Sequence, residues 1–276
     1  TSITPGNMAI GAGGYPADSW YTAYYICQEI KALGINMNFA PTIDLFTDHD
    51  STIIGTRAFS DDPVTTGILG SAFAAGSSAA GVIPTVKHFP GHGDTSLDSH
   101  GKLPVIDIDF NTFKNRELVP YIYLIRENVP AVMTGHLSFP QIETSGAPAS
   151  LSKYFLTDLL RGQLGYKGLI ITDDMMMVGA TVYAGSLSEA FKMALEAGND
   201  IILSSTTARL NESLWTKNLE LMTTNPDFRE RVKDAAYHVL KAKLDYFKSE
   251  NAAPLYPDSK KVDQDIPSRE GEKFFL

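Results

Sequence analysis

The densest group of chemistry-bearing side chains lies in residues 85–100, which read TVKHFPGHGDTSLDSH. Three of the six histidines of the chain, His88, His92 and His100, fall in this segment. His100 follows Asp98 by two residues, and in an extended stretch this spacing places both side chains on one face. A carboxylate beside an imidazole orients the ring and raises its pKa, which suits a general acid/base near neutral pH. The spacing predicts such a pair, and the alternative is a solvated polar loop with a local Asp–His contact.

Two adjacent acidic residues, Asp173 and Asp174, follow the apolar run GLIIT at 168–172. Side chains alternate along an extended chain, so one of the two points into the mouth of a barrel and the other points away. An inward carboxylate at a strand end is a candidate nucleophile, base or metal ligand. In the alternative interpretation, Asp174 caps the next segment and Asp173 binds a neighbouring backbone N–H.

Two further segments carry single polar side chains of interest. Arg57 lies in a loop between a strand and a helix, where a guanidinium can form two hydrogen bonds to hydroxyls or to a carboxylate. A structural ion pair of Arg57 with Asp44 or Asp61 is the alternative. His136 stands at a strand end in VMTGHLSF, where we expect it to support the reacting groups rather than to react itself. His238 is expected on the surface.

A metallohydrolase is also conceivable from these side chains. Its candidate ligands would be His88, His92, Asp98, His100, His136 and Asp173. Pro90 and Gly91 interrupt the spacing between His88 and His92, so these two histidines do not share one helical face as an H-x-x-x-H ligand pair does. The pattern therefore favours acid–base chemistry without a metal.

Composition limits the class of protein. The 276 residues (30.1 kDa) have 43% hydrophobic side chains, which is an ordinary globular composition. With 23 Lys and Arg against 32 Asp and Glu, the net charge of −9 argues against nucleic acid or an anionic membrane as the main partner. No apolar run approaches the roughly 18 residues of a membrane span. The single cysteine, Cys27, excludes an intramolecular disulfide framework and a multi-cysteine metal site.

The periodicity of the sequence predicts alternating helices and strands. Helices are expected at 19–33, 63–80, 111–126, 153–164, 187–197 and 226–247, and strands at 37–43, 82–88, 131–135, 168–172 and 200–203. Strands that are apolar on both faces, separated by helices, are typical of a parallel α/β sheet covered on both sides.

The polar groups described above follow these strands, at the ends where a TIM barrel or a doubly wound sheet carries its functional residues. No G-x-G-x-x-G follows a first strand, which counts against dinucleotide binding. Five strands are recognisable, whereas a TIM barrel has eight. A barrel therefore requires strands that the sequence does not contain.

Four motifs together resemble glycoside hydrolase family 3, and within it the β-N-acetylglucosaminidases of the NagZ type. They are NFAPTIDL, IGTRAF, KHFPGHGDTSLDSH and GLIITDDMMMVGA, and the resemblance covers roughly residues 5–243. The D-S-H triplet at 98–100 is typical of the N-acetylglucosaminidase branch. The resemblance implies an α/β fold of the (β/α)8 TIM-barrel type, with the first strands missing from this chain.

The resemblance also implies an activity, namely a retaining exo-β-N-acetylglucosaminidase that hydrolyses terminal β-linked N-acetylglucosamine. Asp173 matches the nucleophile of the family, His100 its acid/base, and Asp98 the partner of that histidine. No cofactor and no metal are implied. The expected substrates are N-acetylglucosaminides such as muropeptide or chitin fragments. An N-acetylglucosaminide phosphorylase and a non-catalytic sugar-binding barrel are the alternatives.

The same resemblance assigns supporting roles to five more residues. Arg57, Lys87 and His88 match residues that hold the hydroxyls of the sugar. Asp44 and His136 match recurrent positions of the family, and we expect them to support the residues that touch the sugar without touching it themselves.

The match to the family departs from the pattern at the beginning of the chain. A D-Q-E-G-G motif and a following arginine, both on an early strand in the family, have no counterpart here. We therefore expect residues 1–249 to form a barrel domain that is incomplete at its N-terminus. The Pro-rich, charged residues 250–276 are expected to form a linker or strap toward a second domain.

Overall fold

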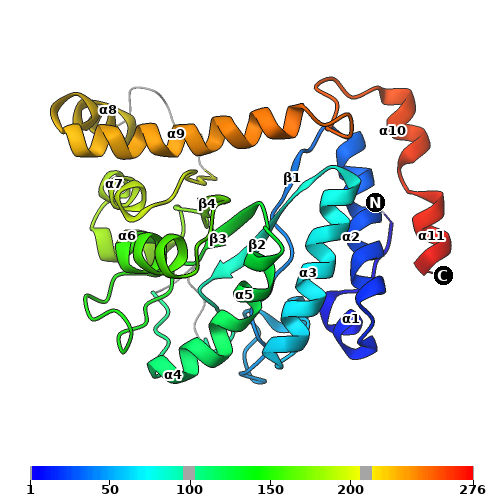
Figure 1. The fold of residues 1–276 in the computed structure, drawn as a ribbon, viewed down its shortest axis with the longest axis horizontal. Helices are drawn as coiled ribbons and strands as arrows, with labels where there is room; N and C mark the ends of the chain where they lie inside the picture. Colours follow the sequence, from blue (N-terminus) through cyan, green and yellow to red (C-terminus); the bar gives the residue numbers. More distant parts are fainter. Residues whose placement is uncertain (1, 96–102, 206–212, 276) are drawn as a thin grey trace.

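A parallel β-sheet forms the centre of the structure (Figure 1). The computed structural model describes residues 2–95, 103–205 and 213–275. The strands are β1 (Met37–Asn38), β2 (Ile83–Phe89), β3 (Ala131–Thr134) and β4 (Leu169–Thr172), and they pair in that order with every pair parallel. The predicted parallel α/β class is thereby confirmed.

Two of the predicted strands continue the sheet mainly through isolated pairs. Beyond β1, Thr42 forms a parallel bridge with Lys87, and the N–H of Ile43 donates to the carbonyl of Lys87 at 2.9 Å. On the other side of the sheet, Ile201 forms a parallel bridge with Ile171 of β4. All five predicted strand positions therefore lie in one parallel arrangement, although the first and the last are shorter than expected.

The helical elements surround this sheet. They are α1 (Asn7–Gly13), α2 (Pro16–Ala32), η1 (Gly55–Arg57), α3 (Pro63–Ala80), α4 (Phe110–Thr112), η2 (Phe113–Glu117), α5 (Leu118–Arg126), η3 (Ala149–Leu151), η4 (Tyr154–Gln163), α6 (Val178–Ala184), α7 (Leu187–Ala197), α8 (Ser213–Thr224), α9 (Pro226–Phe247), α10 (Ser259–Asp265) and α11 (Arg269–Phe275). All the predicted helices are confirmed, whereas α1, α6, α8, α10 and α11 lie outside the predicted helix ranges.

Both faces of the sheet are buried, as the all-apolar strands predict. Val132 and Ile170 belong to the main core, which is completed by side chains of α3, α5, η4 and α7. Their neighbours Ala131 and Leu169 point to the opposite face, because side chains alternate along a strand, and there they pack with Val239 and Ala242 of α9. Figure 1 shows α9 lying across the sheet toward the ends where the strands begin.

Local capping explains why several helix boundaries were predictable. The carboxylate of Asp62 accepts a hydrogen bond from the N–H of Thr65 at 2.7 Å, and α3 ends at Gly81, whose φ is +86°. In the same way the side chain of Asn225 caps α9 by accepting from the N–H of Phe228. These signals act within one helical turn, so they are readable from the sequence.

The two ends of the described chain meet on α2. The buried carboxylate of Glu29 accepts hydrogen bonds from the N–H and the hydroxyl of Ser2 and, at 2.8 Å, from the N–H of Ser268. Helices α10 and α11 contact α2, and Figure 1 shows them beside it. The described part of the predicted linker or strap, residues 250–275, therefore contains two short helices. No helix in the described parts of the chain is long and apolar enough to cross a membrane.

His238 does not behave as the surface residue that was expected. Its Nδ1 lies 2.8 Å from Oδ1 of the buried Asp200, and Nη2 of Arg161 donates to the other carboxylate oxygen at 2.6 Å. Arg231 of α9 also lies close to Asp200, at 3.4 Å. This cluster joins η4 and α9 to the residues that pair with β4.

Candidate active site

The candidate residues converge where neighbouring strands end. Lys87 and His88 belong to β2, His136 follows β3 by two residues, and Asp173 comes directly after β4. Asp44 follows the segment that extends β1. Because the strands are parallel, their carboxyl ends lie at one edge of the sheet, and the side chains meet there.

Asp44 is the buried anchor of this site. Its carboxylate accepts hydrogen bonds from the N–H of His88 at 3.1 Å, from the N–H of His92 at 2.7 Å, and from Nδ1 of His88 at 2.7 Å. Burial alone would raise the pKa of Asp44, but the charge and hydrogen bonds of His88 outweigh it and lower that pKa. Asp44 is therefore an ionised carboxylate that orients His88.

The imidazole of His88 connects Asp44 to Asp173. A carboxylate can only accept, so Nδ1 of His88 carries the proton and Nε2 faces Oδ2 of Asp173, 3.8 Å away. The backbone N–H of Asp173 donates to the carbonyl of Thr134 at 2.9 Å, which ties this residue to the end of β3. The side chain of Asp173 remains 20% exposed, so it is accessible from the strand ends.

Asp174 points elsewhere, as the alternation of side chains predicts. Its Oδ1 accepts hydrogen bonds from the N–H groups of Met176 and Ser205, both at 3.0 Å. Burial alone would raise the pKa of Asp174, but these hydrogen bonds lower it. Asp174 thus caps the following turn. Oδ1 of Asp173 also accepts from the N–H of Asp174 at 2.8 Å, which matches the alternative interpretation in part.

Lys87 and Arg57 supply positive charge at the same edge. Burial lowers the pKa of Lys87, and Arg57 adds to this effect, whereas Asp173 and Asp44 oppose it. The guanidinium of Arg57 is exposed and donates to the carbonyl of Ile53 at 2.6 Å. Among the described residues, no ion pair joins Arg57 to Asp44 or to Asp61, so the alternative interpretation of Arg57 as part of a structural ion pair is wrong.

His136 supports the backbone next to Asp173. Its Nε2 lies 3.1 Å from the carbonyl oxygen of Asp174, and a carbonyl only accepts, so Nε2 carries a proton. Its Nδ1 lies 2.7 Å from Oγ of Ser150, which donates to it when the ring is neutral. Burial lowers the pKa of His136 and favours this neutral form. The side-chain amide of Asn199 in turn donates to the carbonyl of Ser150 at 2.8 Å.

The segment after β2 is held by contacts that the sequence analysis did not find. Nη2 of Arg116 donates to Asp94 at 2.6 Å, and Nε donates to Glu117 at 2.7 Å. Burial raises the pKa of Glu117 to about 7. Thr95 donates to the carbonyl of His92 at 2.8 Å. Nothing in the spacing of Arg116, 22 positions after Asp94, indicates this contact.

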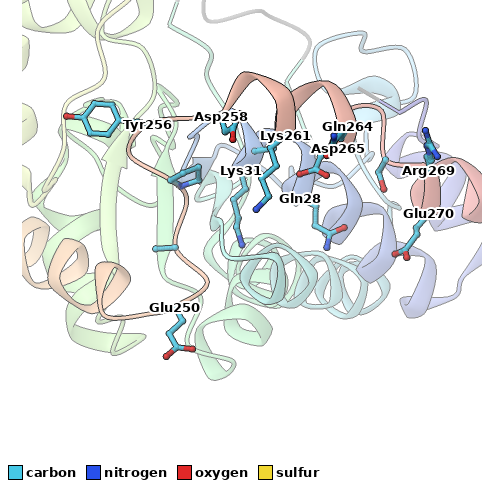
Figure 2. A pocket seen from close by; sticks show the side chains of 14 residues that line it. Gln28, Lys31, Glu250, Tyr256, Asp258, Lys261, Gln264, Asp265, Arg269 and Glu270 are labelled. Atoms are coloured by element: carbon cyan, nitrogen blue, oxygen red, sulfur yellow. The ribbon is translucent and has the colours of Figure 1, made fainter.

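A cavity of about 840 Å³ lies away from these residues, between α2, α10 and the chain that joins α9 to α10 (Figure 2). Lys31 and Lys261 approach each other there, and burial together with the charge of Lys261 lowers the pKa of Lys31. The amino group of Lys31 also donates to the carbonyl of Ala80 at 3.1 Å. This cavity adjoins the end of α2 that precedes β1, so it is not part of the candidate active site.

The comparisons with known proteins identify the family. Residues 1–242 match the model of the glycosyl hydrolase family 3 N terminal domain. The chain belongs to glycoside hydrolase family 3. The N-terminal domain of this family is of the TIM-barrel type, and the parallel α/β arrangement described above agrees with it. The predicted family and fold class are both confirmed.

Several members of family 3 resemble this chain over most of its length. It is 38% identical over 218 residues to the "Beta-hexosaminidase A" of Pseudoalteromonas piscicida, with 74% of this chain and 36% of that protein covered. It is 35% identical over 213 residues to the "Beta-hexosaminidase" of Bordetella avium (strain 197N), with 77% of this chain and 58% of that protein covered. The chain thus spans between about a third and three fifths of these two relatives.

A solved structure gives the same result. The family 3 β-N-acetylglucosaminidase from Paenibacillus sp. str. FPU-7 superimposes with a TM-score of 0.83 at 35% identity, covering 95% of this chain and 51% of that one. The structure of LpqI from M tuberculosis gives a TM-score of 0.79 at 31% identity, covering 87% and 70%.

Within this family 3 chain, the structure brings most of the predicted site residues together. The imidazole of His88 lies between the carboxylates of Asp44 and Asp173. The charges of these two carboxylates act on Lys87, and His136 donates to the carbonyl of Asp174, next to Asp173. Asp98 and His100 lie outside the described residues. In the parts of the chain that the structure describes, no group of three or more His, Cys, Asp or Glu side chains is arranged to hold a metal ion.

Proposed function

We propose that the protein is a retaining exo-β-N-acetylglucosaminidase that removes terminal β-linked N-acetylglucosamine. The observation that carries this proposal is the Asp173 carboxylate, partly exposed at the end of β4 and 3.8 Å from Nε2 of His88, in a chain of glycoside hydrolase family 3. The D-S-H sequence at 98–100 and the names of the relatives, which include β-hexosaminidase and β-N-acetylglucosaminidase, support the choice of sugar.

The proposed reaction is a double displacement. Asp173 attacks the anomeric carbon while His100 gives a proton to the departing oxygen, so the glycosidic C–O bond breaks and a glycosyl ester forms. A water molecule then gives its proton to His100 and attacks the same carbon. This second step releases the sugar and restores the carboxylate of Asp173. Asp98 orients His100 and raises its pKa in this scheme.

The charges at the site suit this division of roles. A neutral imidazole does not repel the nucleophile Asp173 as a second carboxylate would, and an imidazolium is acidic enough near neutral pH to protonate the departing oxygen. Lys87, His88 and Arg57 hold hydroxyl groups of the sugar. Each step uses side chains of the protein and the two substrates alone, so the scheme requires no cofactor or metal.

The preferred substrates in this proposal are N-acetylglucosaminides such as muropeptide or chitin fragments. We assign residues 1–249 to the catalytic domain and residues 250–276 to a strap toward a second domain. The packing of α10 and α11 against α2 supports the strap, and the coverage of only about half of related chains supports a longer protein.

A labelling experiment tests the nucleophile. A 5-fluoro N-acetylglucosaminyl fluoride should form a stable ester with Asp173, which peptide mass spectrometry locates. Asp173→Asn should abolish labelling and lower turnover by about 10³-fold or more, whereas Asp174→Asn, the matched control, should still be labelled at Asp173. Labelling at Asp174, or near-normal turnover of Asp173→Asn, would contradict the assignment.

Substrate comparison tests the rest of the proposal. The 4-nitrophenyl N-acetyl-β-glucosaminide should be cleaved much faster than the corresponding β-glucoside, and the product should be the free sugar with or without phosphate. A preference for the glucoside would contradict the sugar specificity. A sugar 1-phosphate formed in phosphate buffer would instead identify a phosphorylase.

A further inference from the structure

Residues 88–95 form the stem that leads from β2 toward Asp98 and His100. One side of this stem rests on the residues that follow β1. The N–H of His92 donates to Asp44 at 2.7 Å, and a side chain at Gly93 would place its Cβ only 1.9 Å from the carbonyl oxygen of Leu45. The stem is therefore packed backbone to backbone on this side.

The other side of the stem rests on Arg116 and Glu117. The guanidinium of Arg116 reaches Asp94 through Nη2 at 2.6 Å and Glu117 through Nε at 2.7 Å. Glu117 itself lies against Gly91, where an added Cβ would come within 2.4 Å of Oε2. Gly91 has a φ of +139°, a conformation that favours glycine. The pair thus contacts the stem at two points, Gly91 and Asp94.

These contacts are charged and partly shielded from water. The side chain of Glu117 is 1% exposed, while those of Arg116 and Asp94 are each 27% exposed. Burial alone would lower the pKa of Arg116, but Glu117 and Asp94 outweigh it and raise that pKa. Arg116 therefore stays positively charged, and its planar guanidinium donates at once to Asp94 and to the carboxyl group of Glu117. A lysine is a single point charge and lacks this planar set of donors.

We propose that Arg116 is a positioning residue that joins Asp94 to Glu117 and so fixes the stem, residues 88–95, which directly precedes the segment with Asp98 and His100 in the sequence. Asp98 follows Thr95 by three residues, a reach of at most about 10 Å, so a displaced stem displaces the proposed acid/base pair. This inference rests on the proposed function. It adds Arg116 and Glu117 of η2 to the candidate site, whose other residues come from the carboxyl ends of the strands.

The leaving group of the substrate distinguishes positioning from general support of the fold. Proton donation matters for a sugar leaving group but not for 2,4-dinitrophenolate, which departs without a proton. Arg116→Gln should lower kcat/KM for chitobiose by about 10- to 100-fold and for the 2,4-dinitrophenyl glycoside by less than about 3-fold. Arg116→Lys should recover part of the loss. The melting temperature of each variant is measured in parallel.

Two further variants keep the test decisive if Arg116→Gln folds poorly. Asp94→Asn removes the partner of Arg116 at a partly exposed position and should reproduce the selective loss. The double variant should lose no more than Arg116→Gln alone, because the change at Arg116 already breaks the contact with Asp94. Arg126→Gln, an exposed arginine at the end of α5, is the matched control and should leave both rates unchanged.

Equal losses on both substrates in Arg116→Gln and Asp94→Asn would overturn the inference and leave the proposed function standing. A folded wild-type protein that cleaves neither N-acetylglucosaminide would overturn the proposed function, and the positioning role with it.

Discussion

Replacement of Glu117 by Gln should change how the stability of the protein depends on pH. The carboxyl group of Glu117 is almost fully buried, and burial raises its pKa from the usual 4.5 to about 7. The folded state therefore holds a proton that the unfolded state has released. The stabilisation from this proton is fully present below pH 4.5 and is lost as the pH rises through 7. Glutamine has the same shape but no proton to lose.

The size of the effect follows from the two pKa values. At about 1.4 kcal/mol for each pH unit that separates them, the full contribution is about 3 kcal/mol. About 2.5 kcal/mol of it is lost between pH 5 and pH 8. The charged groups that act on Glu117 are Arg116, Asp94 and Asp44. All three remain in the variant, so their own titration largely cancels in the comparison.

The measurement is urea unfolding of wild type and Glu117→Gln at pH 5 and pH 8, at one ionic strength. The free energy of unfolding of the variant minus that of wild type should be about 2.5 kcal/mol larger (the variant relatively more stable) at pH 8 than at pH 5. Glu127→Gln, an exposed residue just after α5, should show no such change. A difference between Glu117→Gln and wild type that is independent of pH, or that favours the variant at pH 5, would refute the reasoning.

Three more predictions follow from single contacts. Asp44→Asn should cost about 2–4 kcal/mol in urea unfolding and lower kcat/KM, because an amide cannot replace a buried carboxylate that accepts three donors; wild-type values in both assays would contradict this. Gly91→Ala should cost more than about 2 kcal/mol, because the new Cβ meets the carboxylate of Glu117 in a strained backbone. Gly146→Ala, also at positive φ but in open space, should cost about 1–2 kcal/mol, and equal losses would show that the clash is unimportant. Asp200→Asn should lower the free energy of unfolding by about 3–5 kcal/mol. It should leave kcat/KM near normal at low temperature, because the Asp200 cluster lies away from the carboxyl ends of the strands, where the candidate site is. A selective loss of activity with normal stability would contradict this.

The order of helices and strands can largely be predicted from short stretches of the sequence. Caps such as Asp62 before α3 and Asn225 before α9, and stops such as Gly81, act over three or four residues, so the predicted boundaries of α3, α7 and α9 match the structure. The short helices α1, α6 and α10 carry too few periodic positions to be recognised. The candidate nucleophile Asp173 was also readable, because it directly follows an apolar strand.

The sequence by itself determined the parallel α/β pattern, the family motifs and the residue types available at the strand ends. Only the tertiary structure decided how they meet. Asp44 and His88 are 44 positions apart, and Arg116 lies 22 positions from Asp94, so the register of the sheet and the packing of η2 set these contacts. The same holds for His238, which binds the buried Asp200 although its helix is polar in sequence. Contacts of this kind depend on the whole fold, since a side chain finds its partner only after distant segments have packed.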